Sequence, residues 1–292
     1  MLRTLCLLSL LSCGSTDSED EDDGDCIDQD GDGYSNCEDC DDLNPQTYPG
    51  ASEICDGQDN NCDGTITYEG NDGQECALCA ENDLFYLTQA TPNRADDISA
   101  ASDGVSCTYS NATRYMFTAL DKQSGQVECV YTGRKVDVGS EKPDPENMNT
   151  EHTWPQSQGA DSLPAKCDLH HLFPTDYNAN QIRAVYPLDD VVSSTSWNQG
   201  GSSLGQNASG AEVFEPRDEH KGNAARALIY FANRYGYSLT PQQWQTYTAW
   251  STLDPIDDAE IARTSEIFRR QGNPNPFVFC PILIEQLATE QP

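Results

Sequence analysis

Hydrophobic residues in the second half of the chain follow two different periods, which predict both helices and strands. Residues 112–120 and 222–237 carry apolar side chains at helical spacing, with few residues that break a helix. Residues 127–132 instead alternate apolar and polar positions, like a strand that ends before a turn at Gly133. We therefore expect an α+β domain over residues 76–292, a length that suffices for a packed core.

Two further elements are expected around a histidine-rich stretch. Residues 168–173 are a candidate for a short strand that Pro174 stops, and residues 177–184 can begin a helix with Asp176 as its N-cap. With an upstream strand that ends at His152, the order becomes strand, loop, strand and helix. Such a unit would bring side chains of the strand end and of the helix together.

The first residues of the chain have the composition of an export signal. One positive charge, at Arg3, precedes an apolar run that is too short to span a bilayer as a helix. Residues 10–13, Leu-Leu-Ser-Cys, resemble a bacterial lipobox, which implies cleavage before Cys13 and lipid attachment to its sulfur. We expect a signal peptide over residues 1–12 and an exported protein: a cell-surface or periplasmic lipoprotein, or a secreted protein. An ordinary signal peptide with an incidental cysteine is the alternative.

The net charge of −33 at first argues against a nucleic-acid partner, because proteins that bind nucleic acids usually present a basic face. However, residues 14–75 hold 21 Asp and Glu residues and no Lys or Arg, so most of the excess belongs to this part. Residues 76–292 carry only −13. A nucleic acid would meet this domain through a local basic patch and a bound cation, so we expect weak, salt-sensitive and non-specific binding.

Eleven cysteines remain when Cys6 and Cys13 are set aside, and export makes disulfides their default state. Two C-x-x-C pairs, Cys37/Cys40 and Cys76/Cys79, could instead form redox dithiols or parts of a zinc site. Neither pair has a neighbouring basic residue that would activate a thiol. We expect disulfides, and because the number is odd, one thiol is free or paired outside the chain.

Residues 13–25 form an acidic tether, and the segment that follows, residues 26–75, contains the spacing of a calcium loop. Oxygen donors stand at loop positions 1, 3, 5, 9 and 12, which are Asp28, Asp30, Asp32, Asn36 and Asp39. Gly33 stands at position 6, where the loop must turn sharply. Asp39 replaces the longer bidentate Glu of an EF-hand, and no amphipathic helices flank the loop, so a full EF-hand is not expected.

The continuation of this segment, residues 40–64, resembles a short Asp/Cys metal-binding motif found on many bacterial surface proteins. We therefore predict that residues 26–75 form a small, disulfide-rich, loop-dominated segment that binds Ca²⁺. The alternative is a disordered polyanionic spacer, because the segment has too few apolar residues for a core.

Candidate catalytic residues lie in two short blocks, Asn149 to Ser157 and Asp168 to Arg183. The expected strand and helix would bring Glu151 and His152 opposite Asn178 or Asn180. A neutral imidazole can take a proton from water near neutral pH, and carboxylate and amide oxygens suit Mg²⁺ or Ca²⁺. Arg183, one turn from Asn180, can hold a phosphate. A zinc site of three His residues is an alternative, but the chain lacks the H-E-x-x-H spacing.

Together, these two blocks resemble the bacterial secreted endonuclease I family. Further blocks at residues 214–226, 250–263 and 271–277 follow in the order of that family, so the resemblance covers residues 97–281. It implies a mainly helical nuclease domain over residues 76–292, built around a ββα-metal (His-Me finger) site. Such enzymes cut DNA, and often RNA, without strong sequence preference.

By that resemblance, His152 is the general base that activates the attacking water, and Glu151 and Asn180 ligate one Mg²⁺ or another divalent cation. Hydrolysis would then leave 5′-phosphate ends. Some family members hold the phosphate with an Arg between the two strands, where this chain has only Lys166, so Arg183 is the expected phosphate contact.

Two positions depart from the family pattern, since Asn223 stands where an Asp is usual and Pro274 replaces an Arg. A contact to DNA can therefore differ in this chain. We expect a monomeric, exported, metal-dependent, non-specific endonuclease. The alternative is a calcium-binding surface lipoprotein whose nuclease-like domain is inactive.

Overall fold

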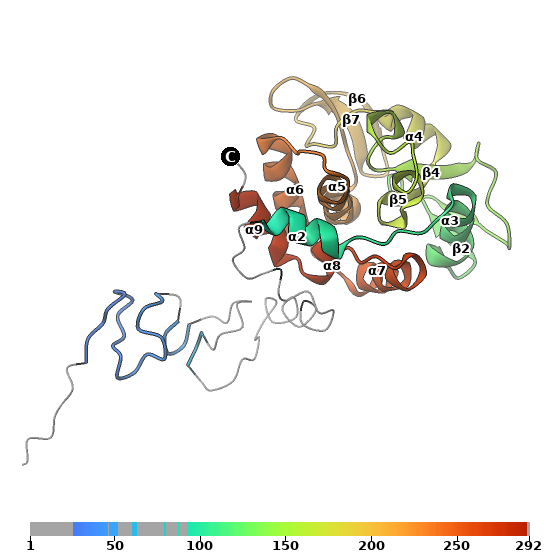
Figure 1. Cartoon of the computed structure of the whole chain (residues 1–292). Helices are drawn as coiled ribbons and strands as arrows, with labels where there is room; N and C mark the ends of the chain where they lie inside the picture. The colour runs from blue at the N-terminus through green and yellow to red at the C-terminus, as the bar shows by residue number, and fades with distance from the viewer. Residues whose placement is uncertain are drawn as a thin grey trace, which may run out of the picture. The chain divides into compact units, whose positions relative to one another are not determined.

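The computed structural model describes residues 26–45, 47–51, 60–62, 79, 87 and 93–290 (Figure 1). The contact pattern divides the chain into two units, one with Met1–Ser52 and Asp59–Ile66 and the other with Glu53–Gln58 and Thr67–Pro292. The expected signal peptide, acidic tether, Cys13 anchor and boundary between residues 75 and 76 lie outside the described residues. Within the described residues, every helix is too short or too polar to cross a membrane.

The smaller unit consists of turns and bends in its described residues, as expected for a loop-dominated segment. Two disulfides, Cys26–Cys37 and Cys40–Cys62, link these described residues. The two cysteines of the first C-x-x-C pair thus bond to partners outside the pair.

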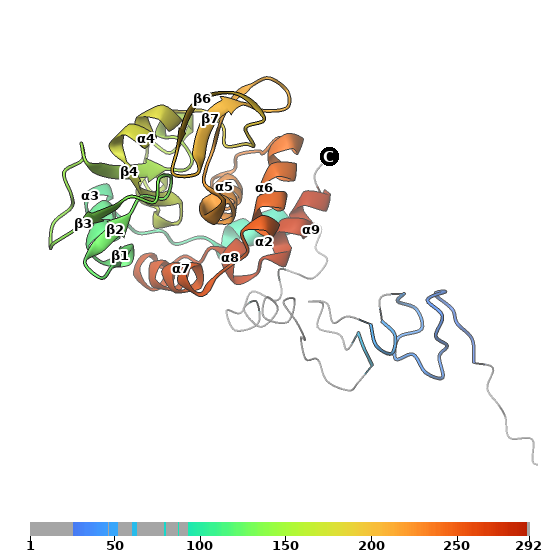
Figure 2. The same cartoon turned by 180° about the vertical axis from the view of Figure 1, so that it is seen from behind.

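The larger unit contains both helices and small sheets, which confirms the α+β class (Figures 1 and 2). In its described residues, the helices are α2 (Arg94–Ala101), α3 (Tyr109–Tyr115), α4 (Tyr177–Arg183), α5 (Lys221–Tyr235), α6 (Pro241–Leu253), α7 (Asp258–Gln271), α8 (Pro276–Phe279) and α9 (Ile282–Glu290). A π-helix, η2 (Met116–Leu120), continues α3, and the 3-10 helices are η3 (Gln156–Gln158), η4 (Ala165–Cys167), η5 (Leu169–His171) and η6 (Asp218–His220).

In the part of this unit that the structure describes, the strands form three antiparallel sheets. They are β1 (Lys122–Gln123), β2 (Gln126–Glu128) and β3 (Lys135–Asp137) in the first, β4 (Met148–His152) and β5 (Leu172–Asp176) in the second, and β6 (Ser193–Gln199), β7 (Ser202–Gln206) and β8 (Glu212–Glu215) in the third. The disulfides Cys79–Cys280 and Cys107–Cys167 also belong to this unit. Among the described cysteines, buried Cys129 is free.

Helix α5 is the centre of the core, and both views show it in the middle of the larger unit, with α6 beside it. Most of its side chains are buried, among them Ile229, Tyr230 and Phe231. The helix ends at Gly236, whose left-handed φ of +71° suits glycine at a helix C-terminus. The predicted helices over 222–237 and 112–120 are therefore confirmed, the second as α3 and η2.

The predicted strand over 127–132 is too long. Strand β2 ends at Glu128, because the chain turns where the Gly133 amide donates to the Cys129 carbonyl at 2.9 Å. This turn places the side chain of Tyr131, which is fully buried, inside the domain rather than on a sheet face.

The predicted strand over residues 168–173 is wrong in both its start and its end. The Asp168 carboxylate accepts from the His170 amide and caps the 3-10 helix η5, so the strand begins only at Leu172. Strand β5 then runs through Pro174, whose carbonyl accepts from Val130 at 3.0 Å. The backbone nitrogen of Pro174 lies on the same side of the strand as this carbonyl, away from β4. Its missing N–H therefore removes no hydrogen bond between β4 and β5.

Candidate active site and metal-binding segment

Strands β4 and β5 and helix α4 form one compact unit that carries the predicted catalytic residues. The antiparallel register pairs Glu151 with Phe173 and His152 with Leu172, at the end of β4. Helix α4 begins directly after β5 and packs on both strands. Asp176 occupies its N-cap position as predicted, but its carboxylate bonds to Thr132 and Arg134 instead of capping the helix.

Asn180 is the asparagine that faces β4, whereas Asn178 is exposed. The Asn180 amide nitrogen donates to Asn149 Oδ1 at 2.8 Å and to the Thr150 carbonyl at 3.1 Å. Both N–H groups are used in these bonds, so the amide oxygen is the atom that remains to bind another group. This arrangement fits an asparagine that contributes an oxygen to a cation.

The Glu151 side chain is buried, with 1% of its surface exposed. Its Oε1 accepts from the Tyr131 hydroxyl at 2.8 Å and lies 3.1 Å from Arg183 Nε, while Oε2 has no hydrogen bond from the described residues. Burial raises the pKa of Glu151, and the Arg183 charge and the Tyr131 hydrogen bond oppose this rise. A carboxylate oxygen and an amide oxygen are hard donors, so Glu151 and Asn180 fit Mg²⁺.

The side chain of Arg183, the expected phosphate contact, is buried. Only 2% of its surface is exposed, and its terminal nitrogens donate to the carbonyls of Thr153 at 2.6 Å and Ala184 at 3.0 Å. With its Nε beside Glu151, the guanidinium is a buried counter-charge for this carboxylate. The structure therefore does not support a phosphate contact by Arg183, which stays a prediction from the sequence.

His152 is 7% exposed and is held through both ring nitrogens. Its Nε2 lies 3.2 Å from the Lys166 carbonyl, and its Nδ1 lies 3.4 Å from the Gln156 amide nitrogen. Because a carbonyl only accepts, Nε2 carries the proton and Nδ1 keeps a lone pair. Burial and the neighbouring His171 lower the pKa of His152 to about 3, so the ring is neutral near pH 7.

The other two histidines of this region have structural partners. His171 donates from Nε2 to the Ala165 carbonyl at 2.7 Å, and its ring meets the His152 ring edge-on at 5.5 Å. His170 Nε2 lies 3.0 Å from the Asn273 carbonyl. Within the described parts of the chain, no group of metal-ligating side chains includes a histidine. The zinc alternative therefore has no support there.

Sequence reasoning missed two neighbours of the site. Tyr131 has no signal in the sequence, because it reaches Glu151 from a turn 20 residues upstream. Gln156 could have been found, since it stands four residues after His152 in the same motif. The Lys166 ammonium also lies close by, 5.4 Å from the centre of the Tyr109 ring, which itself contacts His152.

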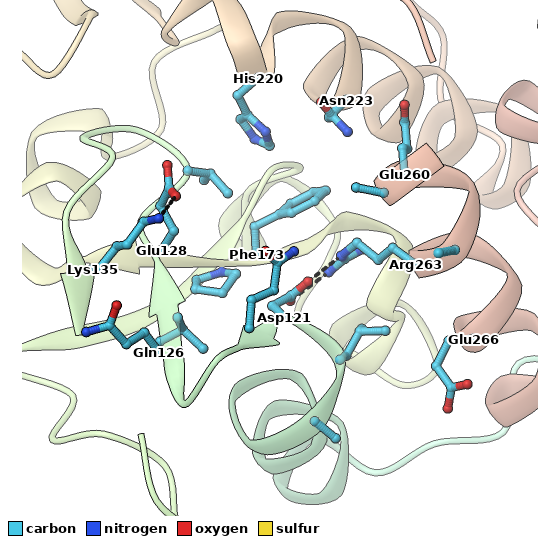
Figure 3. A pocket seen from close by; sticks show the side chains of 18 of the residues that line it. Asp121, Gln126, Glu128, Lys135, Phe173, His220, Asn223, Glu260, Arg263 and Glu266 are labelled. Carbon is cyan, nitrogen blue, oxygen red and sulfur yellow. Dashed lines mark hydrogen bonds and ion pairs between the residues drawn. The ribbon is translucent and has the colours of Figure 1, made fainter. Parts of the chain in front are cut away.

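A cavity of about 720 Å³ lies between β2, η2 and α7, and Figure 3 shows its side chains. Phe173, the register partner of Glu151, forms part of its wall. Six carboxylates but only two basic side chains line it, and Arg263 already pairs with Asp121. Because this lining is acidic, the cavity does not favour a phosphate, and we do not place a nucleic acid in it.

The predicted calcium loop brings its first three carboxylates together. Oxygens of Asp28, Asp30 and Asp32 lie within 4.8 Å of one another. Asp28 accepts from the amides of Gly31 at 2.7 Å and Gly33 at 3.1 Å, which folds the loop around this carboxylate. Burial and the carboxylates of Asp32, Asp39 and Asp28 raise the pKa of Asp30.

Three of the predicted ligands share one hydrogen-bond pattern. In Asp30, Asp32 and Asp39, Oδ1 accepts from the backbone amide two residues further along the chain, at 3.2, 2.9 and 2.9 Å, respectively. Their Oδ2 atoms are buried and have no hydrogen-bond partner among the described residues. Buried carboxylate oxygens without a partner are costly, so this donor set fits a bound cation.

Asn36 does not follow this pattern. Its side chain is exposed, and its Oδ1 accepts from the Ile27 amide at 3.1 Å. The side chain closes the base of the loop instead of facing the carboxylates, so the structure does not support the predicted ligand role of Asn36.

Comparison with known proteins gives two family matches. A model described as Endonuclease I matches residues 58–282, which is well over half of the chain. A second model, described as a metal-binding motif, matches residues 39–67.

The chain is also similar to several bacterial nucleases. It is 31% identical over 158 residues to an extracellular ribonuclease of Bacillus subtilis (strain 168), covering 46% of this chain and 52% of the relative. It is 34% identical over 116 residues to an extracellular deoxyribonuclease of Aeromonas hydrophila, covering 38% and 48%, respectively. A periplasmic deoxyribonuclease of Aeromonas hydrophila is 33% identical over 116 residues, covering 38% and 46%. The chain thus spans about half the length of the curated relatives it matches.

Proposed function

The chain belongs to the endonuclease I family, and from this premise we propose that it is an exported endonuclease that hydrolyses DNA with a divalent cation. The match over residues 58–282 includes every residue of the candidate active site, and this observation carries the proposal. RNA is a second candidate substrate, because one relative is named a ribonuclease. The paired strands and helix that hold Glu151, His152 and Asn180 support a ββα-metal (His-Me finger) site.

In the proposed mechanism, His152 Nδ1 accepts the proton of the attacking water. The hydrogen bond from Nε2 to the Lys166 carbonyl keeps the lone pair on Nδ1, so the ring need not change tautomer before it acts. When held by Glu151 and Asn180, Mg²⁺ would stabilise charge on the phosphate and on the departing 3′ oxygen. Cleavage on this side of the phosphate leaves 5′-phosphate ends.

Export and membrane attachment are part of the proposal. Relatives named extracellular and periplasmic nucleases support export, and the lipobox-like residues 10–13 support lipid attachment at Cys13. We propose that the protein acts as a monomer outside the cytoplasm, where its disulfides are stable.

A digestion assay tests the nuclease proposal. Purified full chain should cut plasmid DNA with Mg²⁺ and stop in EDTA, and His152→Gln should cut about 10²–10⁴-fold more slowly. His220→Gln is the matched control, because His220 is also a buried histidine but has no contact with Glu151 or Asn180 within the described parts of the chain. It should keep the parental rate to within a few-fold. Equal losses in both variants would show a folding defect and remove His152 from the mechanism.

A second proposed function is calcium binding by residues 26–75. The buried, unpartnered oxygens of Asp30, Asp32 and Asp39 support it, together with the metal-binding motif match. Calorimetric titration of the full chain with Ca²⁺ tests it, since Asp30→Asn should weaken binding. If Ca²⁺ binds but no variant or metal condition gives cleavage, the alternative of a calcium-binding lipoprotein with an inactive domain is correct.

A further inference from the structure

Asp42 lies outside the predicted calcium loop, yet its carboxylate has the same pattern as the loop ligands. Only 8% of its surface is exposed. Its Oδ1 accepts from the Gln29 amide at 3.1 Å, and its Oδ2 is buried with no hydrogen-bond partner among the described residues. Gln29 stands between the ligands Asp28 and Asp30, so the Asp42 carboxylate packs against the start of the loop.

The two disulfides of the smaller unit hold Asp42 in this position. Cys26–Cys37 closes the loop itself, and Cys40–Cys62 ties down the turn that separates Asp39 from Asp42. The sulfurs of Cys40 and Cys62 lie close to Asp39 but are bonded to each other, so they are not thiolate ligands. The donors that remain are carboxylate oxygens, which suit a hard cation such as Ca²⁺.

From these contacts we infer that Asp42, rather than Asn36, is a ligand of the calcium site. The loop over residues 28–39 and the metal-binding motif over residues 39–67 then bind one cation together. Asp39 and Asp42 are the ligands that the motif contributes. This inference rests on the proposed calcium binding and adds to it a ligand and a stoichiometry. Asp28, Asp30, Asp32, Asp39 and Asp42 supply enough negative charge to bind Ca²⁺ without Asn36.

The test uses the full, oxidised chain with Glu151→Gln, so that the candidate magnesium site does not contribute. Terbium replaces Ca²⁺ as a probe, because Tyr34 lies in the loop and can sensitise its emission. Calcium should displace the bound terbium and so reduce its emission, and calorimetry should give a stoichiometry of one Ca²⁺ per chain. Asp42→Asn should weaken calcium binding at least about tenfold, since even outer partners of a metal site cost about 10–100-fold.

Matched variants separate the outcomes. Glu38→Gln removes one charge from an exposed side chain of the same loop and should leave the affinity unchanged. If Asp30→Asn weakens binding but Asp42→Asn does not, Asp42 is no ligand and the inference is overturned. If the parent chain binds two Ca²⁺ ions and only Asp42→Asn abolishes binding of the second, the proposal of one shared site is overturned. If neither Asp30→Asn nor Asp42→Asn changes the affinity, the proposed calcium function itself fails.

Discussion

One hydroxyl group fixes the Glu151 carboxylate from a distant part of the chain. Tyr131 is fully buried and donates to Oε1 at 2.8 Å, while Arg183 approaches the same oxygen from α4. Both partners act on Oε1, so they orient the carboxylate without using Oε2. Tyr131 and Arg183 therefore position the carboxylate that we propose as a metal ligand.

Tyr131→Phe should therefore raise the Mg²⁺ concentration needed for half-maximal cleavage by about 10–100-fold, the usual effect of losing an outer partner of a metal site. Titration of Mg²⁺ in the digestion assay measures this shift. Tyr235→Phe is the control, because it also loses a hydroxyl that donates to a carboxylate, that of Asp168, at 2.9 Å. An equal shift in both variants would mean that Tyr131 acts only through stability.

The sequence predicted the candidate site only where local spacing carries the information. Glu151, His152 and Asn180 stand in short blocks, and the strand and helix between them bring these residues together. Burial is not visible in such spacing, so Arg183 was predicted as a phosphate contact although its guanidinium is enclosed. Tyr131 could not be predicted, because its contact depends on a turn far upstream of the blocks.

The buried ring of His220 should make the free energy of unfolding depend on pH. Burial and the charges of Arg263, Arg217 and Arg226 lower the pKa of His220 to about 3, below the 6.5 of an ordinary histidine. Between these values the unfolded chain binds a proton that the folded chain does not, so acidification destabilises the fold. From pH 7 to pH 4 this residue should remove about 3 kcal/mol from the free energy of unfolding.

Urea unfolding of the parent and of His220→Gln at several pH values measures this contribution. The variant lacks the titrating ring, so its stability relative to the parent should improve as the pH falls through 6.5. A stability difference that stays constant from pH 7 to pH 4 would contradict the assignment.

Among the elements, the 3-10 helix η4 connects the core of the fold to His152, the proposed general base. It carries Lys166, whose carbonyl holds His152, and Cys167, whose disulfide to Cys107 ties η4 to the segment before α3. The bridge joins positions 60 residues apart, so its loss should cost about 4 kcal/mol of stability. Cys107→Ala/Cys167→Ala should lower both the thermal midpoint and the cleavage rate, since the acceptor for His152 Nε2 is released.

Tryptophan fluorescence follows this unfolding in the larger unit alone, because all four Trp residues lie within residues 76–292. The double variant Cys26→Ala/Cys37→Ala removes a disulfide of the smaller unit and should leave the tryptophan transition unchanged. If both double variants shift it equally, the effect does not come from η4.

The elements also show which parts of the fold a sequence can reveal. Helix α5 was predicted over residues 222–237 from its long apolar period, although the helix ends before Gly236. The strand around Pro174 was misjudged, because proline blocks a strand only where its N–H would face a partner. That direction depends on the register with β4, which is a tertiary property.

The net charge of the molecule determines how strongly it binds nucleic acid and how this binding depends on salt. Residues 76–292 carry −13, so few cations are available for phosphate, and most arginines near the site are already paired. Lys166 differs, because its ammonium has no carboxylate within ion-pair distance in the part of the chain that the structure describes. This ammonium lies 5.4 Å from the centre of the Tyr109 ring, and that ring packs on His152, so we expect Lys166 to contact a phosphate bound near His152.

We expect that duplex DNA binds the His152→Gln chain weakly, with a slope of log affinity against log salt of about −1 to −4, as for a few phosphate contacts. Lys166→Gln should reduce this slope by about 1, because one contact that releases a counterion is lost. Lys135→Gln is the control, since the Lys135 ammonium lies 3.4 Å from Glu128 and should not contribute. Fluorescence anisotropy over a salt series measures all three slopes. Tight binding with an affinity that does not depend on salt concentration would contradict this expectation, because it would show that contacts to the phosphate charges do not dominate DNA binding.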